Sequence, residues 1–253
     1  MKFKLISSYA VLAAEARREL LNRYNITEDS NEADAIIVLG GDGTMLGAIH
    51  HHIGQNLPIF GMNRGSVGFL MNEYHAEGLE ERVQAAKLSV VHPLKARVTN
   101  IYGEAVEHLA INDVSITRQT GQAAKLRVSI NGEAKLDELI GDGLIVSTPV
   151  GSTAYNRSAG GPILPLEAPI LAVTPICAFR PRHWKGAVIP DSFAVRVDVI
   201  EEEHRFVNVQ VDSAEIKNTR SVEIAMDRTT AIQILCDPNR SWSDKILNEQ
   251  FCG

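Results

Sequence analysis

Apolar and polar residues follow two different patterns along this chain of 253 residues, and the pattern changes near residue 90. In the first part, short continuous apolar runs are separated by segments that carry apolar residues at helical spacing. Residues 35–39 form such a run, which ends at two glycines, and residues 10–24 place apolar side chains on one helical face. The run is typical of a buried parallel strand, whereas the second pattern predicts an amphipathic helix.

The neighbouring segments continue this alternation of strand and helix. Residues 4–7 and 57–61 are short strand candidates, and residues 44–52 predict a helix soon after the glycines. Because strand, loop, helix and strand follow one another, we expect an open, mostly parallel sheet. The first part of the chain therefore predicts a Rossmann-like α/β domain.

Beyond residue 90, apolar and polar residues alternate with a period of two. The alternation is clearest in residues 126–130, 193–199, 206–211 and 221–225. Asn131 and Gly132 follow the first of these segments and are the strongest short signal for a β-hairpin. Long helical patterns are nearly absent from residues 93–237. This part of the chain predicts an antiparallel, β-sandwich-like domain.

The change of pattern also predicts the domain boundaries. We expect residues 1–90 to form the Rossmann-like domain and residues 91–240 to form the β domain. Residues 241–251 look helical, and we expect the tail of residues 241–253 to pack back on the first domain.

Composition and charge narrow the class of ligand. The net charge of −6 provides no basic field for nucleic acid or anionic lipid. Phosphate-bearing small molecules remain suitable, because glycine-rich loops and helix N-termini bind anions without net positive charge. The three cysteines form no Cys-x-x-Cys pair, and no apolar stretch suits a signal peptide or a membrane span. We expect a cytoplasmic protein that binds neither nucleic acid nor membranes.

The sharpest local signal is the glycine-rich segment of residues 39–46, which lies between a predicted strand and a predicted helix. Its glycines allow close approach of a ligand to the backbone and allow positive φ angles. Asp42 is its only ionisable residue, and it could accept a proton from an attacking hydroxyl or hold Mg²⁺. The same residues also fit an ordinary strand-to-helix turn with an aspartate cap. Alone, this loop indicates phosphate binding and no more.

A second signal is the run of residues 141–162, which is dense in glycine and hydroxyl side chains. After Val150 it has too few apolar residues for a core, so we expect it to wrap a polar ligand, with Tyr155 offering a ring face and a hydroxyl. A solvated loop is the alternative. Asn112 and Asp113 lie in a strand-like run, where both need hydrogen-bond partners such as ribose hydroxyls, although a turn would also explain them.

Taken in order, these motifs resemble those of the NAD kinase family, of the bacterial ATP- or polyphosphate-dependent type. The resemblance covers most of the chain and rests on residues 40–44, the Asn112-Asp113 pair, and residues 142–161. Diacylglycerol-type lipid kinases share the glycine loop, and phosphofructokinases share it more loosely, whereas the long motif is specific to NAD kinases. The resemblance implies transfer of a phosphoryl group from ATP to the 2′-hydroxyl of the adenosine ribose of NAD.

The resemblance also implies roles for individual residues. Asp42 matches the proton acceptor, Phe69 an aromatic near the adenine, and Asp142 a carboxylate at the nicotinamide end. The positions that match ligand contacts are Asp42, Gly43, Phe69, Asn112, Asp113, Asp142, Thr153, Ala154, Tyr155, Asn156, Arg157, Ser158, Thr174 and Ile176. Thr174 and Ile176 match positions at a subunit interface, which implies a homodimer or homotetramer.

Two further expectations follow from the resemblance. Mg²⁺ would arrive on the phosphates of ATP, because the sequence has no carboxylate cluster for a metal site of its own. Residues 212–214 read Asp-Ser-Ala where the family often has Asp-Gly-Gln, so one amide contact to the ligand is missing. A lipid kinase and a non-catalytic NAD(P) sensor remain as competing functions, and the retained Asp42 argues against the sensor.

Overall fold

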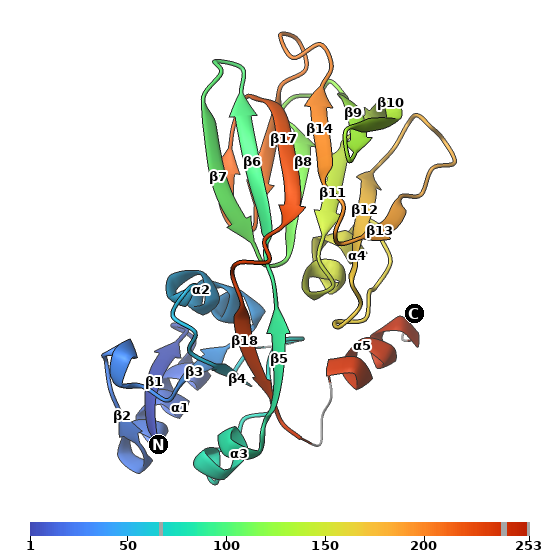
Figure 1. Cartoon of the computed structure of the whole chain (residues 1–253). Coiled ribbons are helices and arrows are strands. Elements are labelled where there is room, and N and C mark those ends of the chain that lie inside the picture. Colours follow the sequence, from blue (N-terminus) through green and yellow to red (C-terminus); the bar gives the residue numbers. More distant parts are fainter. Residues whose placement is uncertain (66–67, 239–241, 252–253) are drawn as a thin grey trace. The chain divides into compact units, whose positions relative to one another are not determined.

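The computed structural model describes residues 1–65, 68–238 and 242–251. The chain divides into two units, one made of residues 1–91 and 229–253 and the other of residues 92–228 (Figure 1). The chain thus leaves the first unit after one β-strand and returns to it with another.

The first unit contains a single six-stranded sheet with the order β2-β1-β3-β4-β18-β5. Its strands are β1 (Lys2–Ser7), β2 (Asn25–Ile26), β3 (Ala35–Gly40), β4 (Ile59–Asn63), β5 (Lys87–Val91) and β18 (Ile232–Cys236). All neighbouring pairs are parallel except β18 with β5. The order changes direction between β1 and β3, because β2 lies on one side of this pair and β4 on the other.

Helices cover both faces of this sheet, as right-handed crossovers in opposite directions require. The helices are α1 (Val11–Arg23), α2 (Asp42–His52), α3 (Leu79–Ala85) and α5 (Trp242–Phe251), with a 3₁₀ turn η1 (Ser30–Glu32). On one face, Leu20 of α1 and Val83 of α3 share a core with Ile37 of β3. The side chains of β3 alternate between the faces, and α2 packs against the other one.

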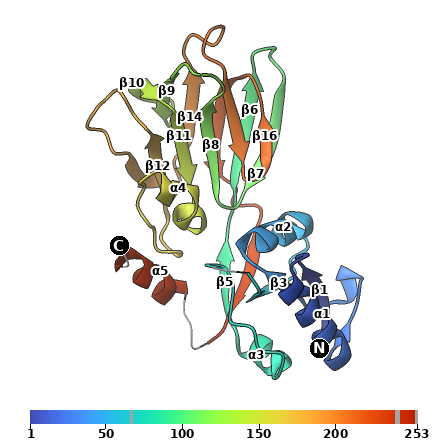
Figure 2. The same ribbon diagram turned by 180° about the vertical axis from the view of Figure 1, so that it is seen from behind.

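The second unit is made of two antiparallel sheets, as the views in Figures 1 and 2 show. One has the order β10-β9-β14-β17-β6-β7 and the other β13-β12-β11-β8-β15-β16. The first consists of β6 (Leu94–Asn100), β7 (Ala105–Ala110), β9 (Ala124–Ile130), β10 (Glu133–Gly141), β14 (Val195–Val199) and β17 (Thr219–Met226). The second consists of β8 (Asp113–Arg118), β11 (Gly143–Ser147), β12 (Ile170–Ile176), β13 (Ala187–Pro190), β15 (Val207–Val211) and β16 (Ala214–Ile216).

One apolar core joins the two sheets of this unit into a sandwich. Alternate residues of facing strands, such as Val197 and Val222 on one sheet and Val146 and Val209 on the other, are buried in it. The second unit has little helix, only the 3₁₀ turn η2 (Val150–Thr153) and the short α4 (Tyr155–Ser158) among the described residues. Both follow β11 directly.

The structure confirms the predicted fold class, an α/β unit followed by an antiparallel β-sandwich. The predicted hairpin lies between β9 and β10, where Asn131 and Gly132 adopt the positive φ angles that its turn needs. Two details differ. α2 begins at Asp42 rather than at Thr44, and β18, expected in the β domain, belongs to the first sheet.

The helical tail lies within the first unit. Lys245 of α5 donates a hydrogen bond to the carbonyl of Met71, and Trp242 and Ile246 are buried. Residues 239–241 and 252–253 of the expected tail and boundary region lie outside the described residues, as do Ser66 and Val67.

Candidate functional site

The glycine loop joins β3 to α2 at the point where the strand order of the first sheet changes direction. β3 ends at Gly40, Gly41 caps the helix with extended backbone, and Asp42 is the first residue of α2. In open α/β sheets, ligands bind at the carboxyl ends of the strands beside such a switch point. The first-turn N–H groups of α2 lie at the same place and favour an anion.

The carboxylate of Asp42 holds the segment that follows β4. It accepts the backbone N–H groups of Phe69 at 2.8 Å and Leu70 at 2.9 Å, one on each oxygen. Burial raises the pKa of Asp42, and the two N–H groups and the nearby Lys245 ammonium lower it in part. Each oxygen keeps a lone pair, so Asp42 can still accept a hydrogen bond from a ligand hydroxyl.

Positive φ angles, which the sequence led us to expect, do not explain the glycines of this loop. Gly40, Gly41 and Gly43 do not adopt them. A Cβ on Gly40 would lie 2.4 Å from the hydroxyl of Thr44, so this glycine is required by packing. A Cβ on Gly43 would meet nothing within 4 Å. Neither backbone conformation nor packing in the described chain requires the glycine at 43, which is the position expected to contact the ligand.

A groove runs beside this loop, with a volume of about 690 Å³. Its lining includes Gly43 and Thr44 of α2, and Ser7, Ser8 and Tyr9 from the end of β1 and the residues after it. Volumes between roughly 300 and 1,000 Å³ are usual for ligand sites. The groove has the volume of a nucleotide-sized ligand and extends beside β1 and along α2 as far as His52.

In the second unit, Asn112 and Asp113 lie at a bend where the chain leaves β7 of one sheet and enters β8 of the other. Asn112 lies in the bend and Asp113 is the first residue of β8, so the pair lies at the start of a strand rather than in its middle. The carboxylate of Asp212 accepts the N–H groups of residues 111–113, and the carbonyl of Asn112 accepts the N–H of Thr148 at 2.9 Å. A Cβ on Gly151 would lie 2.2 Å from this carbonyl, so the backbone approaches closely there.

The backbone of the bend is hydrogen-bonded, but the side chains of Asn112 and Asp113 are not. Neither side chain makes a hydrogen bond or ion pair with a described residue. Asp113 is nevertheless buried, and burial together with the charge of Asp212 raises its pKa to about 7. Burial, and then the proximity of Asp113, raises the pKa of Tyr155, which places this phenol near the bend. An amide, a carboxylate and a half-exposed aromatic ring are therefore available to a polar ligand.

The hydroxyl-rich segment 141–162 was expected to wrap a ligand rather than to form a core. Much of it is buried. β11 is fully buried, and in η2 Ser152 is buried with its hydroxyl bonded to the carbonyl of Pro149 at 2.7 Å. Small side chains allow the backbone to approach closely here, and hydroxyls bond to backbone polar groups. The segment can therefore be buried without apolar residues. Thr153, Ala154 and Arg157 are half-buried, and Ser158 is exposed.

Two predicted contacts are engaged within the chain itself. The amide of Asn156 is fully buried, donates to the carbonyls of Ser152 and Pro162, and accepts the hydroxyl of Thr174 at 2.6 Å. Ile176 is also buried. The side chains of Thr174 and Ile176 therefore do not project from the surface, and Asn156 and Thr174 hold the segment in shape.

The remaining predicted residues lie on accessible parts of their units. Asp142 joins β10 to β11, and its carboxylate accepts the Arg118 side chain at 2.6 Å. Phe69 is half-buried beside Asp42. Three residues were missed by the sequence analysis: Asp212, which holds the 111–113 bend, Thr148 on its other side, and Lys245 near Asp42. Thr148 lies within the run of residues 141–162 and Asp212 begins the departing segment 212–214, so both carried a signal, whereas nothing in the sequence marked Lys245.

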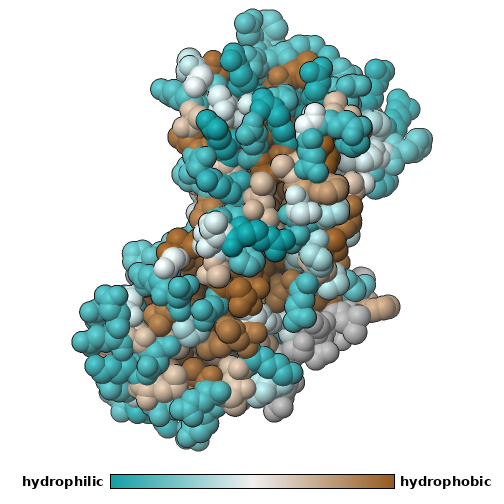
Figure 3. Space-filling view, in the orientation of Figure 1, coloured by the Kyte–Doolittle hydropathy of each residue, from teal (hydrophilic) through white to brown (hydrophobic). Residues whose placement is uncertain are grey.

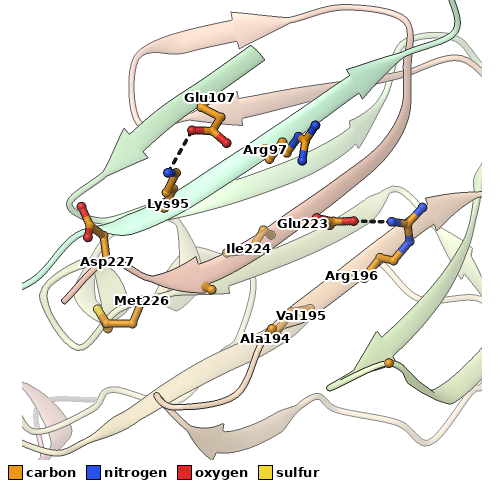
Figure 4. Close-up of a pocket in the computed structure, with 12 residues that line it drawn as sticks. Lys95, Arg97, Glu107, Ala194, Val195, Arg196, Glu223, Ile224, Met226 and Asp227 are labelled. Carbon is orange, nitrogen blue, oxygen red and sulfur yellow. Dashed lines mark hydrogen bonds and ion pairs between the residues drawn. The ribbon is translucent and has the colours of Figure 1, made fainter. Parts of the chain in front are cut away.

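Other surface features carry no comparable chemistry. The hollow in Figure 4, of about 510 Å³, lies on the outer face of the β6–β17 sheet, whose visible surface in Figure 3 is mostly hydrophilic. It is crossed by a Lys95–Glu107 ion pair at 2.9 Å and an Arg196–Glu223 pair, and no predicted site residue lines it. Within the described residues, no group of three or more metal-ligating side chains occurs. No described helix is long and apolar enough to span a bilayer.

Two solved structures, of an NADH kinase and of an NAD kinase, have the same fold as this chain. The structure of yeast NADH kinase complexed with NADH matches 99% of this chain and 87% of that chain, with a TM-score of 0.83 and 21% identity. That of an NAD kinase from Archaeoglobus fulgidus in complex with ATP matches 99% of both chains, with a TM-score of 0.79 and 20% identity. At this identity the likeness establishes the fold.

Sequence relatives are closer. The NAD kinase of Rhizobium meliloti (strain 1021) is 47% identical over 252 residues, which cover 99% of this chain and 98% of the relative. The NAD kinase of Caulobacter vibrioides is 48% identical over 239 residues, covering 94% and 92%. The alignments span both units of the structure.

A glycine loop at a strand-order switch, an aspartate in the first helical turn and a groove of nucleotide size are typical of an enzyme that binds a phosphate-bearing small molecule. Residues 9–86 match the N-terminal domain of ATP-NAD kinases, and residues 111–234 match their C-terminal domain. The chain belongs to the NAD kinase family. Its activity is the ATP-dependent phosphorylation of NAD to NADP.

Proposed function

We propose that the chain transfers the γ-phosphoryl group of ATP to the 2′-hydroxyl of the adenosine ribose of NAD, with Asp42 as the proton acceptor. The observation that carries this proposal is the placement of Asp42. Its carboxylate lies in the first turn of α2, is fixed by the N–H groups of Phe69 and Leu70, and retains lone pairs for a hydroxyl. A fixed acceptor can orient the attacking oxygen before the reaction.

Phosphoryl transfer exchanges one phosphorus–oxygen bond for another. The 2′-oxygen forms a bond to the γ-phosphorus, the bond from that phosphorus to the β–γ bridging oxygen breaks, and ADP leaves with the electron pair. Asp42 takes the hydroxyl proton as the new bond forms and later passes it to water. Burial helps, because it raises the pKa of Asp42 and makes the carboxylate a better base than an exposed one.

The charge of the transferred group needs neutralisation, which Mg²⁺ bound to the ATP phosphates supplies. The described residues contain no cage of metal ligands, so the cation would arrive with the nucleotide. We place the donor in the groove beside the glycine loop. Gly43 and the first-turn N–H groups of α2 line it, and the absence of a side chain at 43 leaves room for a phosphate.

Binding of NAD is assigned to polar side chains of the second unit. Asn112 and Asp113 would bond to ribose hydroxyls, and Tyr155 offers its ring or its phenol. Asp142, Arg157 and Ser158 are accessible for further contacts. Asn156 and Thr174 would act indirectly, because their side chains already bond to each other.

Two finer properties also belong to the proposal. We propose a homodimer or homotetramer, with the segment after β12 at the interface: Phe179 is 54% exposed there, and the guanidinium groups of Arg180 and Arg182 each lie 5.7 Å from the centre of its ring. We propose a cytoplasmic location, supported only by the cysteine pattern and the composition of the sequence.

The direct test mixes the protein with ATP, Mg²⁺ and NAD and follows NADP with an NADP-specific dehydrogenase. ³¹P NMR of the product then identifies the phosphorylated hydroxyl. A signal from a 2′-phosphomonoester supports the proposal, and a 3′-phosphate would overturn it. Diacylglycerol in vesicles, supplied as the alternative acceptor, tests for a lipid kinase, and binding of NAD without any turnover would indicate a sensor.

A further inference from the structure

The N–H groups of the bend that carries Asn112 and Asp113 are held by the carboxylate of Asp212. Its Oδ2 accepts the N–H of Ile111 at 2.6 Å, and its Oδ1 accepts those of Asn112 at 3.0 Å and Asp113 at 3.3 Å. In return, the N–H of Asp212 donates to the carbonyl of Asp113 at 3.2 Å. Successive N–H groups that converge on one anion form a concave anion site, and here the anion is a carboxylate of the same chain.

The carbonyl groups of the bend are held from the opposite side. The hydroxyl of Thr148 donates to the carbonyls of Ile111 at 2.7 Å and Asn112 at 3.1 Å. The backbone of the bend is thus fixed by hydrogen bonds to its N–H and its C=O groups. The side chains of Asn112 and Asp113 have no such partner among the described residues, so the fixed backbone presents them to a ligand.

Asp212 occupies a backbone conformation that an aspartate adopts at a cost. It lies in the two-residue turn between β15 and β16 with φ of 48°, in the left-handed region where glycine is least strained. β15 pairs with β8, with Val211 opposite Val114, which brings this turn beside the start of β8. A carboxylate at this position is explained by its three hydrogen bonds.

We propose that Asp212 is a positioning residue for NAD binding: it aims Asn112 and Asp113 at the ligand, and its charge controls whether Asp113 is ionised when NAD binds. This proposal rests on the proposed role of Asn112 and Asp113 in holding NAD. It adds to that role a second carboxylate that does not touch the ligand and a dependence of binding on pH.

The electrostatics of the pair give the direction of that dependence. The titratable groups that face Asp113 within its unit are Asp212 and the phenol of Tyr155, and Asp142 and Cys177 act on Tyr155 in turn. Burial and the Asp212 charge raise the pKa of Asp113 to about 7. Ribose hydroxyls donate to an ionised carboxylate. NAD therefore binds the ionised form better, and its affinity rises as the pH passes from 6 to 8.

The experiment uses the full-length enzyme and compares the wild type with Asp212→Asn and Asp212→Ala. KM for NAD, KM for ATP and kcat are measured from pH 6 to 8.5. In the wild type, KM for NAD should fall about tenfold between pH 6 and 8, because only the ionised fraction of Asp113 is competent. Isothermal titration of NAD in two buffers of different ionisation enthalpy should show proton release near pH 7.

Asp212→Asn removes the charge and leaves one acceptor oxygen for three N–H groups. It should raise KM for NAD about tenfold at pH 8, with kcat and KM for ATP changed less than about threefold. It should also reduce the change of KM for NAD between pH 6 and 8 to less than about twofold, since the pKa of Asp113 falls. Asp212→Ala should bind NAD more weakly still, and if it does not fold, the Asn variant alone decides.

Glu215→Gln is the matched control, because it neutralises an exposed carboxylate on the same hairpin that bonds only to surface groups. An Asp212→Asn enzyme with unchanged KM for NAD, or with a raised KM that keeps the wild-type pH dependence, would overturn the proposal. Asp113→Ala separates it from the proposed function. If that variant leaves KM for NAD unchanged, the binding role of the pair itself is wrong, whatever Asp212 does.

Discussion

At the scale of single residues, the carboxylates of this chain differ in how they are satisfied. Asp42 receives two backbone N–H groups, Asp212 receives three, and Asp113 receives none from a described residue. A buried carboxylate without partners is costly in its charged form. Asp42 and Asp212 therefore shape loops through their charge, whereas the ionised form of Asp113 is buried at an energetic cost.

That cost predicts a pH-dependent effect of Asp113→Asn on stability. The pKa of Asp113 is about 7 in the fold and about 3.9 in the unfolded chain. The contribution of Asp113 to the free energy of unfolding is therefore fully present below pH 4 and is lost as the pH rises to 7. The Asn variant, which cannot ionise, should melt roughly 3–8 °C higher than the wild type at pH 8 and within about 2 °C of it at pH 5.

Differential scanning fluorimetry at both pH values provides this measurement. Asp137→Asn, an exposed aspartate of the same unit, is the control and should show no such pH dependence. If Asp113→Asn shifts the melting temperature equally at pH 5 and pH 8, ionisation of Asp113 does not strain the fold.

At the scale of elements, local patterns were enough to predict the three longest helices and several of the strands. The apolar run that became β3 and the Asn131-Gly132 hairpin depend on neighbours in sequence, which is why they were foreseen. β18 was assigned to the wrong domain because its partner strands, β4 and β5, lie more than a hundred residues earlier in the chain. Asp212 was missed for the same reason, since its hydrogen-bond partners are separated from it by about a hundred residues.

The second motif shows a different limit of sequence analysis. Hydroxyl and glycine residues after Val150 indicated a ligand-facing loop, yet Ser152 and Asn156 are buried and bonded within the chain. Small polar residues look alike in sequence whether they satisfy a ligand or the backbone. Tyr155 and Ser158 of this motif are exposed, and their role as ligand contacts stays a prediction.

The first turn of α2 gives a prediction that separates stability from activity. Gly43→Ala places a methyl group in open space on a helix, so the fold should gain up to about 1 kcal/mol in its free energy of unfolding. If phosphate approaches the backbone at this point, the methyl group should lower kcat/KM for ATP by at least about tenfold.

Thermal melts and steady-state kinetics on the same preparation test both halves. Gly121→Ala is the control, because it adds the same methyl group where nothing lies within 4 Å, far along the chain from the glycine loop. A Gly43→Ala enzyme with full activity would show that no ligand needs the space beside this residue.

At the scale of the whole molecule, membership of the NAD kinase family and the proposed oligomer lead to a further prediction. Phe179→Asp should weaken self-association, because it replaces an exposed aromatic ring with a charge on the segment after β12. Activity should fall together with assembly if the active site needs a second copy. Light scattering coupled to size exclusion gives the assembly state, and a fully active monomer would contradict the oligomeric proposal.

The central claim is that Asp42 accepts the proton during phosphoryl transfer to NAD. Asp42→Asn tests it, but this substitution also affects the structure. The amide oxygen of Asn can accept the N–H of Phe69 or of Leu70, whereas the amide NH₂ group would face the other N–H, donor against donor. NAD and ATP binding must therefore be measured by calorimetry beside the rate, with Asp137→Asn as a control that makes the same substitution at an exposed residue of the other unit.

The decisive measurement is the single-turnover rate of NADP formation by Asp42→Asn at saturating ATP and NAD. Saturation removes any loss of affinity, so this rate reports on the chemical step alone. If Asp42 accepts the proton, this rate should fall roughly 10²-fold or more relative to the wild type. A rate within about threefold of the wild type would contradict it and leave Asp42 with the role of holding Phe69 and Leu70.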